Sequence, residues 1–173
     1  MERLPVGVVV VNWNGGALLD ACLDALDPQG ASRLLVVDNG SEPDEVRRLA
    51  NRDGVFVLPL GANRGFAPAS NAGAVDARLK ALPFLAFVNN DAVLEPGYLA
   101  ACVAALEADP GLSAVQGVVL DADGTRVDGL GLGWNRRHEA VQLGHGEEPP
   151  AAGGAPFPVA GVSGTAPVFR RAA

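Results

Sequence analysis

Short polar signatures follow the apolar runs of this chain, at places where a parallel sheet would gather ligand-binding groups. Three runs end in Asn12, in Asp38 and in the Asn-Asn-Asp triplet at 89–91, and a fourth ends just before residues 61–66. In a parallel α/β sheet the carboxyl ends of the strands border one crevice, where ligands bind. We therefore expect these side chains to converge on a single site.

The triplet at 89–91 suits a divalent cation. Asn89 and Asp91 offer two oxygen-bearing side chains at i and i+2, directly after an apolar run. Mg²⁺ typically takes one or two carboxylates together with phosphate oxygens and water. A cation beside a nucleotide crevice suggests transfer chemistry on a nucleotide-activated group. The alternative is a polar turn that leads into the helix opened by Pro96.

Two further polar stretches fit a nucleotide. An acid after the second strand, here Asp38, accepts hydrogen bonds from ribose hydroxyls or a base N–H, although residues 38–41 also fit an ordinary turn. Residues 61–66 supply Arg64 as a cation for phosphate beside a helix N-terminus; the alternative is a loop with a solvated arginine. Asn71 is a poor helix former in an Ala-rich stretch and has no evident structural role there.

Composition and motifs exclude several classes. Residues 12–16 do not form GxGxxG and the chain has no Walker A motif, which argues against dinucleotide and P-loop proteins. A net charge of -7 argues against a general nucleic-acid surface.

Apolar runs are too short to span a bilayer and the N-terminus lacks a signal-peptide pattern. We therefore expect a cytoplasmic protein, with peripheral contact at the inner membrane face left open. Cys22 and Cys102 read as reduced, buried thiols, and His138 and His145 as solvated side chains.

Apolar runs alternate with amphipathic stretches, and this alternation predicts a parallel sheet wrapped by helices. The expected strands are 6–11, 34–37, 55–58, 84–88 and 113–120, with helices over 16–27, from Ser41 as N-cap with Pro43 in the first turn, over 66–80, and from Pro96 to Asp109. After Leu120 the chain is Gly- and Pro-rich and reads as loops with weak strands, followed by one more strand over 159–170. We expect a single domain over 1–173.

Together these residues resemble family 2 glycosyltransferases, which have the GT-A fold, a Rossmann-like and mostly parallel α/β sheet. The stretches that carry the resemblance are 8–14 (opening strand), 36–41 (nucleotide-binding turn), 63–67 with Asn71 (next loop and helix), 87–91 (metal-binding DXD-type motif) and 161–171 (the strand before the acceptor site). The Asn-Trp-Asn and Asn-Asn-Asp variants are most similar to rhamnosyltransferase-type members. The resemblance divides the domain into nucleotide-binding βα units over 1–120 and a partial acceptor-side segment over 121–173, rich in loops.

The resemblance implies inverting, Mg²⁺- or Mn²⁺-assisted transfer from a nucleotide-diphosphate sugar to a hydroxyl of a carbohydrate or lipid-linked acceptor, with a homo-oligomer left open. It assigns nucleotide binding to Asn12, Asn14, Asp38, Asn63, Arg64, Asn71 and Asn90, the metal to Asp91 and Asn89, and the sugar or acceptor side to Gly161, Ser163, Gly164 and Thr165.

Two departures from the family pattern bear on activity. Asn89 stands where the family usually has Asp, which removes one negative charge from the metal motif. The family's catalytic base, usually an acid in a Glu-Asp pair, lies downstream of the last matching segment, so the catalytic residue stays unassigned; Glu139, Glu147 and Glu148 are the only nearby acids. The alternatives are therefore a truncated or non-catalytic sugar-nucleotide-binding module and, less well matched, a nucleotidyltransferase, which would carry a Gly-rich loop with a basic residue after the first strand.

Overall fold

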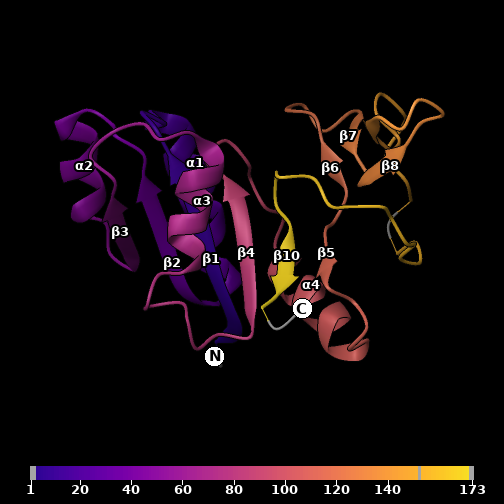
Figure 1. The fold of residues 1–173 in the computed structure, drawn as a ribbon, viewed down its shortest axis with the longest axis horizontal. Coiled ribbons are helices and arrows are strands. Elements are labelled where there is room, and N and C mark those ends of the chain that lie inside the picture. The colour runs from indigo at the N-terminus through magenta and orange to yellow at the C-terminus, as the bar shows by residue number, and fades with distance from the viewer. Residues whose placement is uncertain (1–2, 152, 172–173) are drawn as a thin grey trace.

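A six-stranded sheet forms the body of the protein in the computed structural model, which describes residues 3–151 and 153–171 (Figure 1). The strand order is β3-β2-β1-β4-β10-β5. The bounds are β1 Leu4–Asn12, β2 Ala31–Asp38, β3 Val55–Pro59, β4 Phe84–Asn89, β5 Ala114–Val115 and β10 Val168–Arg170. Strands β3, β2, β1 and β4 are parallel, and β10 lies antiparallel between β4 and β5. The predicted mostly parallel α/β sheet is confirmed.

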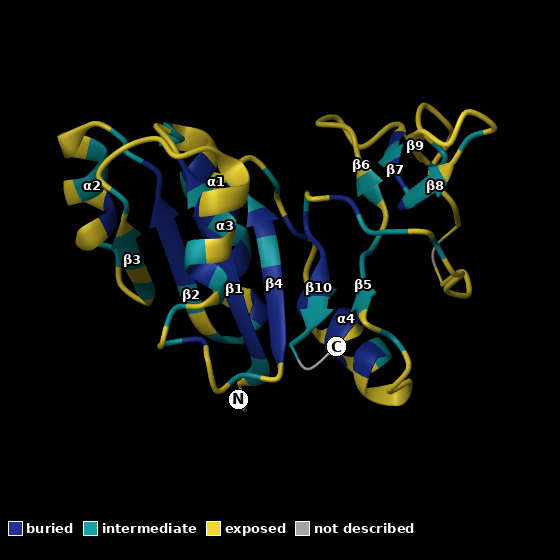
Figure 2. Ribbon diagram, viewed as in Figure 1, coloured by how far each residue is buried: buried dark blue, intermediate teal, exposed yellow. Residues whose placement is uncertain are grey.

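Helices cover both faces of this sheet, which is why its central strands are buried (Figure 2). They are α1 Gly16–Leu26, the short 3₁₀ helix η1 Asp27–Gln29, α2 Pro43–Ala50, α3 Phe66–Ala74 and α4 Tyr98–Ala108. One core cluster includes Leu19 of α1, Leu49 of α2 and Leu99 of α4, and a second one on the opposite face includes Ala69 of α3. Small residues let α3 lie close to the sheet: a Cβ on Gly73 would come within 2.5 Å of Val9 Cγ1.

Strand register brings the expected polar residues to one edge. Asn12 is the register partner of Asp38 across β1 and β2, and Val11 is the partner of Asn89 across β1 and β4. Continuous β-branched runs explain these long, doubly covered strands. The carboxyl ends of β1, β2 and β4 therefore border one region, as the sequence predicts.

Four short strands form two small antiparallel sheets beside the main one (Figure 1). They are β6 Val119–Leu120, β7 Val127–Gly129, β8 Leu132–Trp134 and β9 Ala140–Gln142. This agrees with the expected loops and weak strands after Leu120.

Several boundaries differ from the sequence prediction. The helix expected over 66–80 ends at Ala74, because the Asp76 carboxylate accepts the Arg78 backbone N–H at 2.9 Å and so replaces a helical bond. Ser41 is not the N-cap of α2; that position is Glu42, and the Ser41 hydroxyl bonds elsewhere. α4 begins after Gly97 rather than at Pro96.

The last two predicted strands are shorter than expected. The strand over 113–120 is interrupted at 116–118, and its two halves pair in different sheets, β5 with β10 and β6 with β7. Gly117 in this break packs against Tyr98: a Cβ there would lie 2.6 Å from Cε2 of the ring. In the segment 159–170 only Val168–Arg170 is a strand, and Pro167 before it has no N–H to give to a neighbour.

Cys22 and Cys102 are buried free thiols, as expected. Within residues 3–151 and 153–171, no helix is long and apolar enough to cross a membrane.

Candidate functional site

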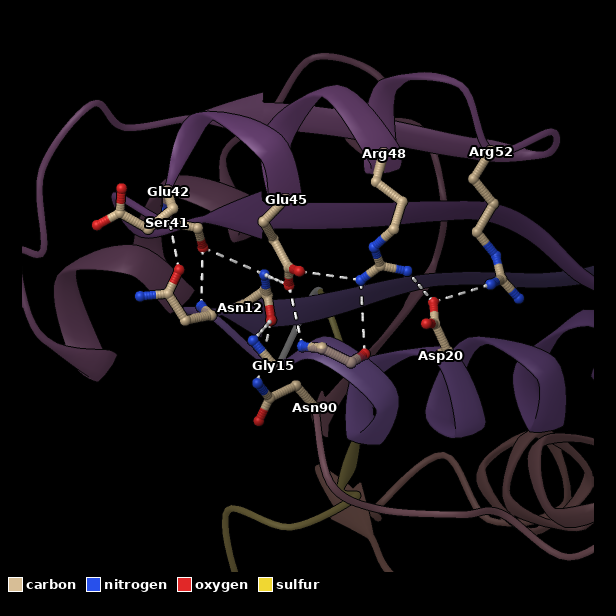
Figure 3. Close-up of polar contacts among 11 residues, drawn as sticks. Asn12, Gly15, Asp20, Ser41, Glu42, Glu45, Arg48, Arg52 and Asn90 are labelled. Atoms are coloured by element: carbon tan, nitrogen blue, oxygen red, sulfur yellow. Dashed lines mark hydrogen bonds and ion pairs between the residues drawn. The ribbon is translucent and has the colours of Figure 1, made fainter.

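The Asn12 side chain joins three loops at the carboxyl edge of the sheet (Figure 3). Its Nδ2 donates to Glu45 Oε1 at 3.1 Å and to Ser41 Oγ at 3.3 Å. Its Oδ1 accepts the Gly15 backbone N–H and Asn90 Nδ2, each at 3.1 Å. Asn12 is fully buried. Its side-chain amide therefore stabilises the loops of the site and is not accessible to solvent.

Asn14 fastens the turn after β1 to the turn after β2. Its backbone N–H donates to Ser41 Oγ at 2.9 Å, and its side-chain oxygen accepts the Glu42 N–H at 2.9 Å. The φ of Asn14 is +50°, a left-handed conformation that asparagine tolerates better than most residues. Asn12, Asn14 and Asn90, expected to bind nucleotide, therefore lie together and bond to protein groups.

The Asp38 carboxylate has one occupied and one unpartnered oxygen. Oδ2 accepts the backbone N–H groups of Gly40 at 3.3 Å and Ser41 at 3.2 Å, so Asp38 does stabilise its own turn. Oδ1 is buried and has no hydrogen-bond partner among the described residues. An unpaired buried carboxylate oxygen is costly, and it marks a place where a ligand donor would be favourable.

Asn39, which the sequence argument passed over as a turn former, connects this turn to the loop after β3. Its Nδ2 donates to Asn63 Oδ1 at 3.1 Å, and its Oδ1 accepts the Arg64 N–H at 2.9 Å. Gly40 permits the close approach: its φ is +86°, and a Cβ there would lie 2.6 Å from backbone atoms of Ala62 and Asn63. The Asp-Asn-Gly order after a strand is the signal that could have revealed this link.

Arg64 and Asn71 keep their side chains toward solvent. The Arg64 guanidinium donates to the Leu60 carbonyl at 3.1 Å and remains exposed. Asn71 is exposed on α3 and makes no side-chain hydrogen bond within the described parts of the chain. Asn63, in contrast, accepts the Gly65 N–H at 2.9 Å in addition to Asn39, so its role in the loop is structural.

The cation motif stands at the end of β4. Asp91 is exposed and forms no salt bridge or side-chain hydrogen bond among the residues described. Asn89 is half-buried, and its carbonyl accepts the Cys22 thiol at 3.4 Å. Burial, with a smaller effect from the charge of Asp91, raises the pKa of that thiol to about 12, so Cys22 keeps the proton that it donates to Asn89.

The expected sugar or acceptor side is only partly gathered at this edge. The Asn89 N–H donates to the Thr165 carbonyl at 2.9 Å, and a Cβ on Gly164 would lie 4.0 Å from the Phe66 ring. Ser163 is buried, and its Oγ has no partner in the described part of the chain. Gly161 instead pairs with Leu132 of β8, away from the end of β4.

Glu45 is a site residue that the sequence argument missed. Its Oε1 accepts Asn12 Nδ2 and the Gly16 N–H at 3.2 Å, and Oε2 accepts the Arg48 guanidinium at 3.0 Å (Figure 3). Partial burial raises the pKa of this carboxyl, but the bonds from Arg48, Asn12 and Gly16 and the charge of Arg48 outweigh it, so the pKa lies below its usual value. Glu45 therefore supports Asn12 as a carboxylate.

The acids and histidines of the small sheets lie in exposed turns. Glu139 accepts Asn135 Nδ2 at 2.8 Å inside the β8–β9 turn, and Glu147 and Glu148 are exposed after β9. His145 Nδ1 lies 3.0 Å from the Asp128 carbonyl and is exposed, as is His138.

Solved structures with this sheet include enzymes that act on nucleotide sugars. The mannosyltransferase PcManGT from Pyrobaculum calidifontis, in complex with GDP-Man and Mn²⁺, is 27% identical, with a TM-score of 0.57 over 69% of this chain and 36% of that one. GalNAc-T7 with UDP, GalNAc and Mn²⁺ is 17% identical, with a TM-score of 0.67 over 98% of this chain and 36% of that one. The chain thus spans 36% of the length of each.

A synthetase complexed with CTP shares the fold as well. CMP:2-keto-3-deoxy-manno-octonic acid synthetase complexed with CTP is 12% identical, with a TM-score of 0.56 over 96% of this chain and 74% of that one. Below 25% identity, this likeness and the one to GalNAc-T7 concern the fold alone.

A search of curated protein sequences found no match. The family model of glycosyl transferase family 2 matches residues 7–172, nearly the whole chain. With its sheet order and its polar strand ends, this chain belongs to glycosyl transferase family 2.

Proposed function

We propose that this chain binds a nucleotide-diphosphate sugar at the carboxyl ends of β1, β2 and β4 and takes part in transferring the sugar to an acceptor hydroxyl. The observation that carries the proposal is that two acids without partners among the described residues lie at the same sheet edge. Asp38 has a buried oxygen that accepts no hydrogen bond, and Asp91 is exposed. The first suits the nucleoside and the second suits the cation on its diphosphate. Family membership adds the reaction class.

The donor set around Asp91 fits a cation that shares its ligands with a substrate. No group of three or more His, Cys, Asp or Glu side chains that could hold a metal occurs among the described residues. Mg²⁺ and Mn²⁺ sites of this kind are completed by phosphate oxygens and water around one or two protein oxygens. Asp91, with Asn89 beside it, would hold the ion, which neutralises charge on the leaving diphosphate when bound.

The protein's own groups would orient the donor. Asp38 Oδ1 accepts a hydrogen bond from the ribose or base, while the Asn12 and Asn39 networks fix the turns around it. Arg64, exposed beside the first turn of α3, faces solvent with its charge available to the diphosphate. The acceptor hydroxyl gives its proton to a general base and attacks the anomeric carbon on the face opposite the diphosphate. The bond from that carbon to the diphosphate oxygen breaks, which inverts the configuration.

A binding module without transferase activity is the second candidate, favoured by the placement of the acids. Glu139 is engaged in its own turn, and Glu147 and Glu148 are exposed after β9. A general base typically contributes about 10²–10⁴-fold to rate. If no described acid serves as the base, this chain binds the donor but transfers the sugar slowly. We further propose that the donor carries a rhamnosyl group and that the acceptor is a carbohydrate or is linked to a lipid.

Binding and turnover tested side by side distinguish the two candidates. Calorimetry with UDP-, GDP-, CMP- and dTDP-sugars, with and without Mn²⁺ or Mg²⁺, identifies the donor. Nucleotide release from that donor, with and without simple acceptor sugars, measures turnover. Metal-dependent binding with release supports a transferase, and the same binding without release supports the binding module. The absence of binding to any nucleotide sugar would contradict both.

A further inference from the structure

The segment 163–167 lies against the end of β4, where the cation motif begins. The Asn89 N–H donates to the Thr165 carbonyl at 2.9 Å, and the Phe87 N–H donates to the Pro167 carbonyl at 3.0 Å. Ser163 at its start is buried, and its hydroxyl has no partner within residues 3–151 and 153–171. This segment therefore reaches the end of β4 through its backbone, and its position depends on what holds it.

Two side chains outside the segment hold it from the other side. The Tyr98 hydroxyl, in the first turn of α4, donates to the Ala166 carbonyl at 2.7 Å and accepts the Gly117 N–H at 2.9 Å. The Gln116 side-chain oxygen accepts the Ser163 N–H. One hydroxyl thus joins α4, the break after β5 and the segment that reaches Asn89.

The surroundings of Tyr98 leave room for its ring and keep its hydroxyl protonated. Gly117 leaves the ring its space, because a Cβ there would lie 2.6 Å from Tyr98 Cε2. Burial raises the pKa of the hydroxyl above its usual value, so it keeps the proton that it donates to Ala166. Tyr98 is also the single tyrosine of the chain.

We propose that Tyr98 and Gln116 are positioning residues for sugar transfer, which hold the segment 163–167 in place beside the cation motif. The inference rests on the proposed function, in which Asp91, two residues after Asn89, holds the cation on the donor's diphosphate. The loop of Asp91 runs directly into α4, so Tyr98 ties the segment to the same helix that follows the cation ligand. A loosened segment disturbs the sugar and its leaving diphosphate more than the nucleoside, because the nucleoside contact proposed for Asp38 lies at the end of β2.

The test removes single atoms of this arrangement. Tyr98→Phe deletes the hydroxyl and keeps the ring, and Gln116→Leu deletes the acceptor for Ser163 while Gln116→Glu keeps it. We expect kcat for nucleotide release from UDP-glucose or GDP-mannose, whichever the wild type turns over faster, to fall about tenfold in Tyr98→Phe and Gln116→Leu, with KM within about twofold. Gln116→Glu should restore most of the rate.

Hydrogen exchange without any ligand supplies an independent measurement. The Ser163 and Asn89 amides should exchange faster in Tyr98→Phe than in the wild type. The control is Leu26→Val, which removes one buried methylene at the far end of α1 and should lower the melting temperature without changing exchange at Ser163 or kcat.

Unchanged exchange at Ser163 and Asn89 in both Tyr98→Phe and Gln116→Leu overturns the inference, as does an equal loss of kcat in Leu26→Val. A wild type that releases no nucleotide from any donor, while exchange still responds to Tyr98→Phe, contradicts transfer by this chain and leaves the positioning of the segment supported.

Discussion

At the scale of single residues, Asp38 carries two roles on its two oxygens. Oδ2 accepts two backbone N–H groups of its own turn, and Oδ1 is buried without a partner in the described structure. The sequence argument set these roles against each other, as a nucleoside contact or a turn. The structure shows that the turn role is real and leaves one oxygen for a ligand.

Substitutions at Asp38 should separate the two roles. Asp38→Ala removes both carboxylate oxygens. It should therefore weaken nucleoside diphosphate binding about tenfold to a hundredfold and also destabilise the fold by about 1–3 kcal/mol. Asp38→Asn keeps one acceptor oxygen for the turn, so it should retain most of the stability and lose most of the affinity. Calorimetry with UDP and GDP, together with urea unfolding, measures both. Wild-type affinity in Asp38→Asn would refute the nucleoside role.

Asp91 should matter for the cation and not for the fold. It is exposed and unpaired in the described structure, so Asp91→Ala should leave the melting temperature within about 1 °C of the wild type. The same change should abolish the gain in nucleoside diphosphate affinity that Mn²⁺ provides. Asp53→Ala, an exposed acid in the turn before β3, is the matched control. Equal Mn²⁺ dependence in wild type and Asp91→Ala would rule out the cation assignment.

At the scale of elements, α4 depends on a distant side chain for its first turn. Gln29, buried in η1, accepts the Leu99 N–H at 3.2 Å and donates to the Glu95 carbonyl at 2.8 Å. The N-cap residue of α4 is Gly97, which has no side chain that could accept a hydrogen bond from the first turn. Gln29 thereby holds the loop between the cation motif and α4 from behind.

Replacing this buried amide should therefore be costly. Gln29→Leu leaves the Leu99 N–H and the Glu95 carbonyl without these partners, and we expect a loss of about 1–3 kcal/mol in the free energy of unfolding. Gln142→Leu, on the exposed strand β9, should change it by less than about 0.5 kcal/mol. Urea denaturation of the two variants measures the difference. A loss in Gln29→Leu no larger than in the control would show that α4 does not need this cap.

The elements that could be predicted are those whose signal is local. The apolar runs of β1, β2, β3 and β4 fix strands to within a few residues, and the polar strand ends predict their meeting, since parallel strands share an edge. A strand over 159–170 was expected, but the antiparallel position of β10 between β4 and β5 could not be predicted from its own residues. It enters antiparallel beside β4 because Val168 pairs with Ala86, and its position is secured by Arg170 at the Asp109 and Leu112 carbonyls.

The same distinction applies inside the site. Asp38 and Asp91 could be found because an acid directly after a buried strand is an unusual place for charge. Glu45, Gln29 and Tyr98 could not, because each acts through a contact with a residue far away in the chain and sits in an ordinary helical stretch. Ser41 shows the converse: its position before Pro43 predicts a cap, but its hydroxyl is taken by Asn14.

At the scale of the whole molecule, charged pairs connect α1 to α2 and so brace the two turns of the site. Arg48 of α2 pairs with Asp20 of α1 as well as with Glu45, and Arg52 lies 3.4 Å from the same Asp20 carboxylate (Figure 3). Arg52 also reaches Asp24 of α1 at 2.5 Å. Most of these groups are partly exposed, where a single pair contributes little. Glu45 differs, since its side chain is only 12% exposed and also bonds Asn12.

We therefore expect the free energy of unfolding to fall in acid, because Glu45 becomes protonated. Its folded pKa lies below its ordinary value of 4.5, so the carboxylate stabilises the fold at pH values above the unfolded pKa. This contribution is lost as the pH falls through the folded pKa. In Glu45→Gln the amide oxygen can still serve Asn12, but the attraction to Arg48 is gone at every pH. Urea midpoints for the wild type and Glu45→Gln should therefore differ at pH 7 and approach each other as the pH falls through the folded pKa of Glu45. Glu107→Gln, an exposed change on α4, should follow the wild type throughout, and a constant gap between wild type and Glu45→Gln from pH 7 to pH 3 would mean that Glu45 does not link acid to the stability of this edge.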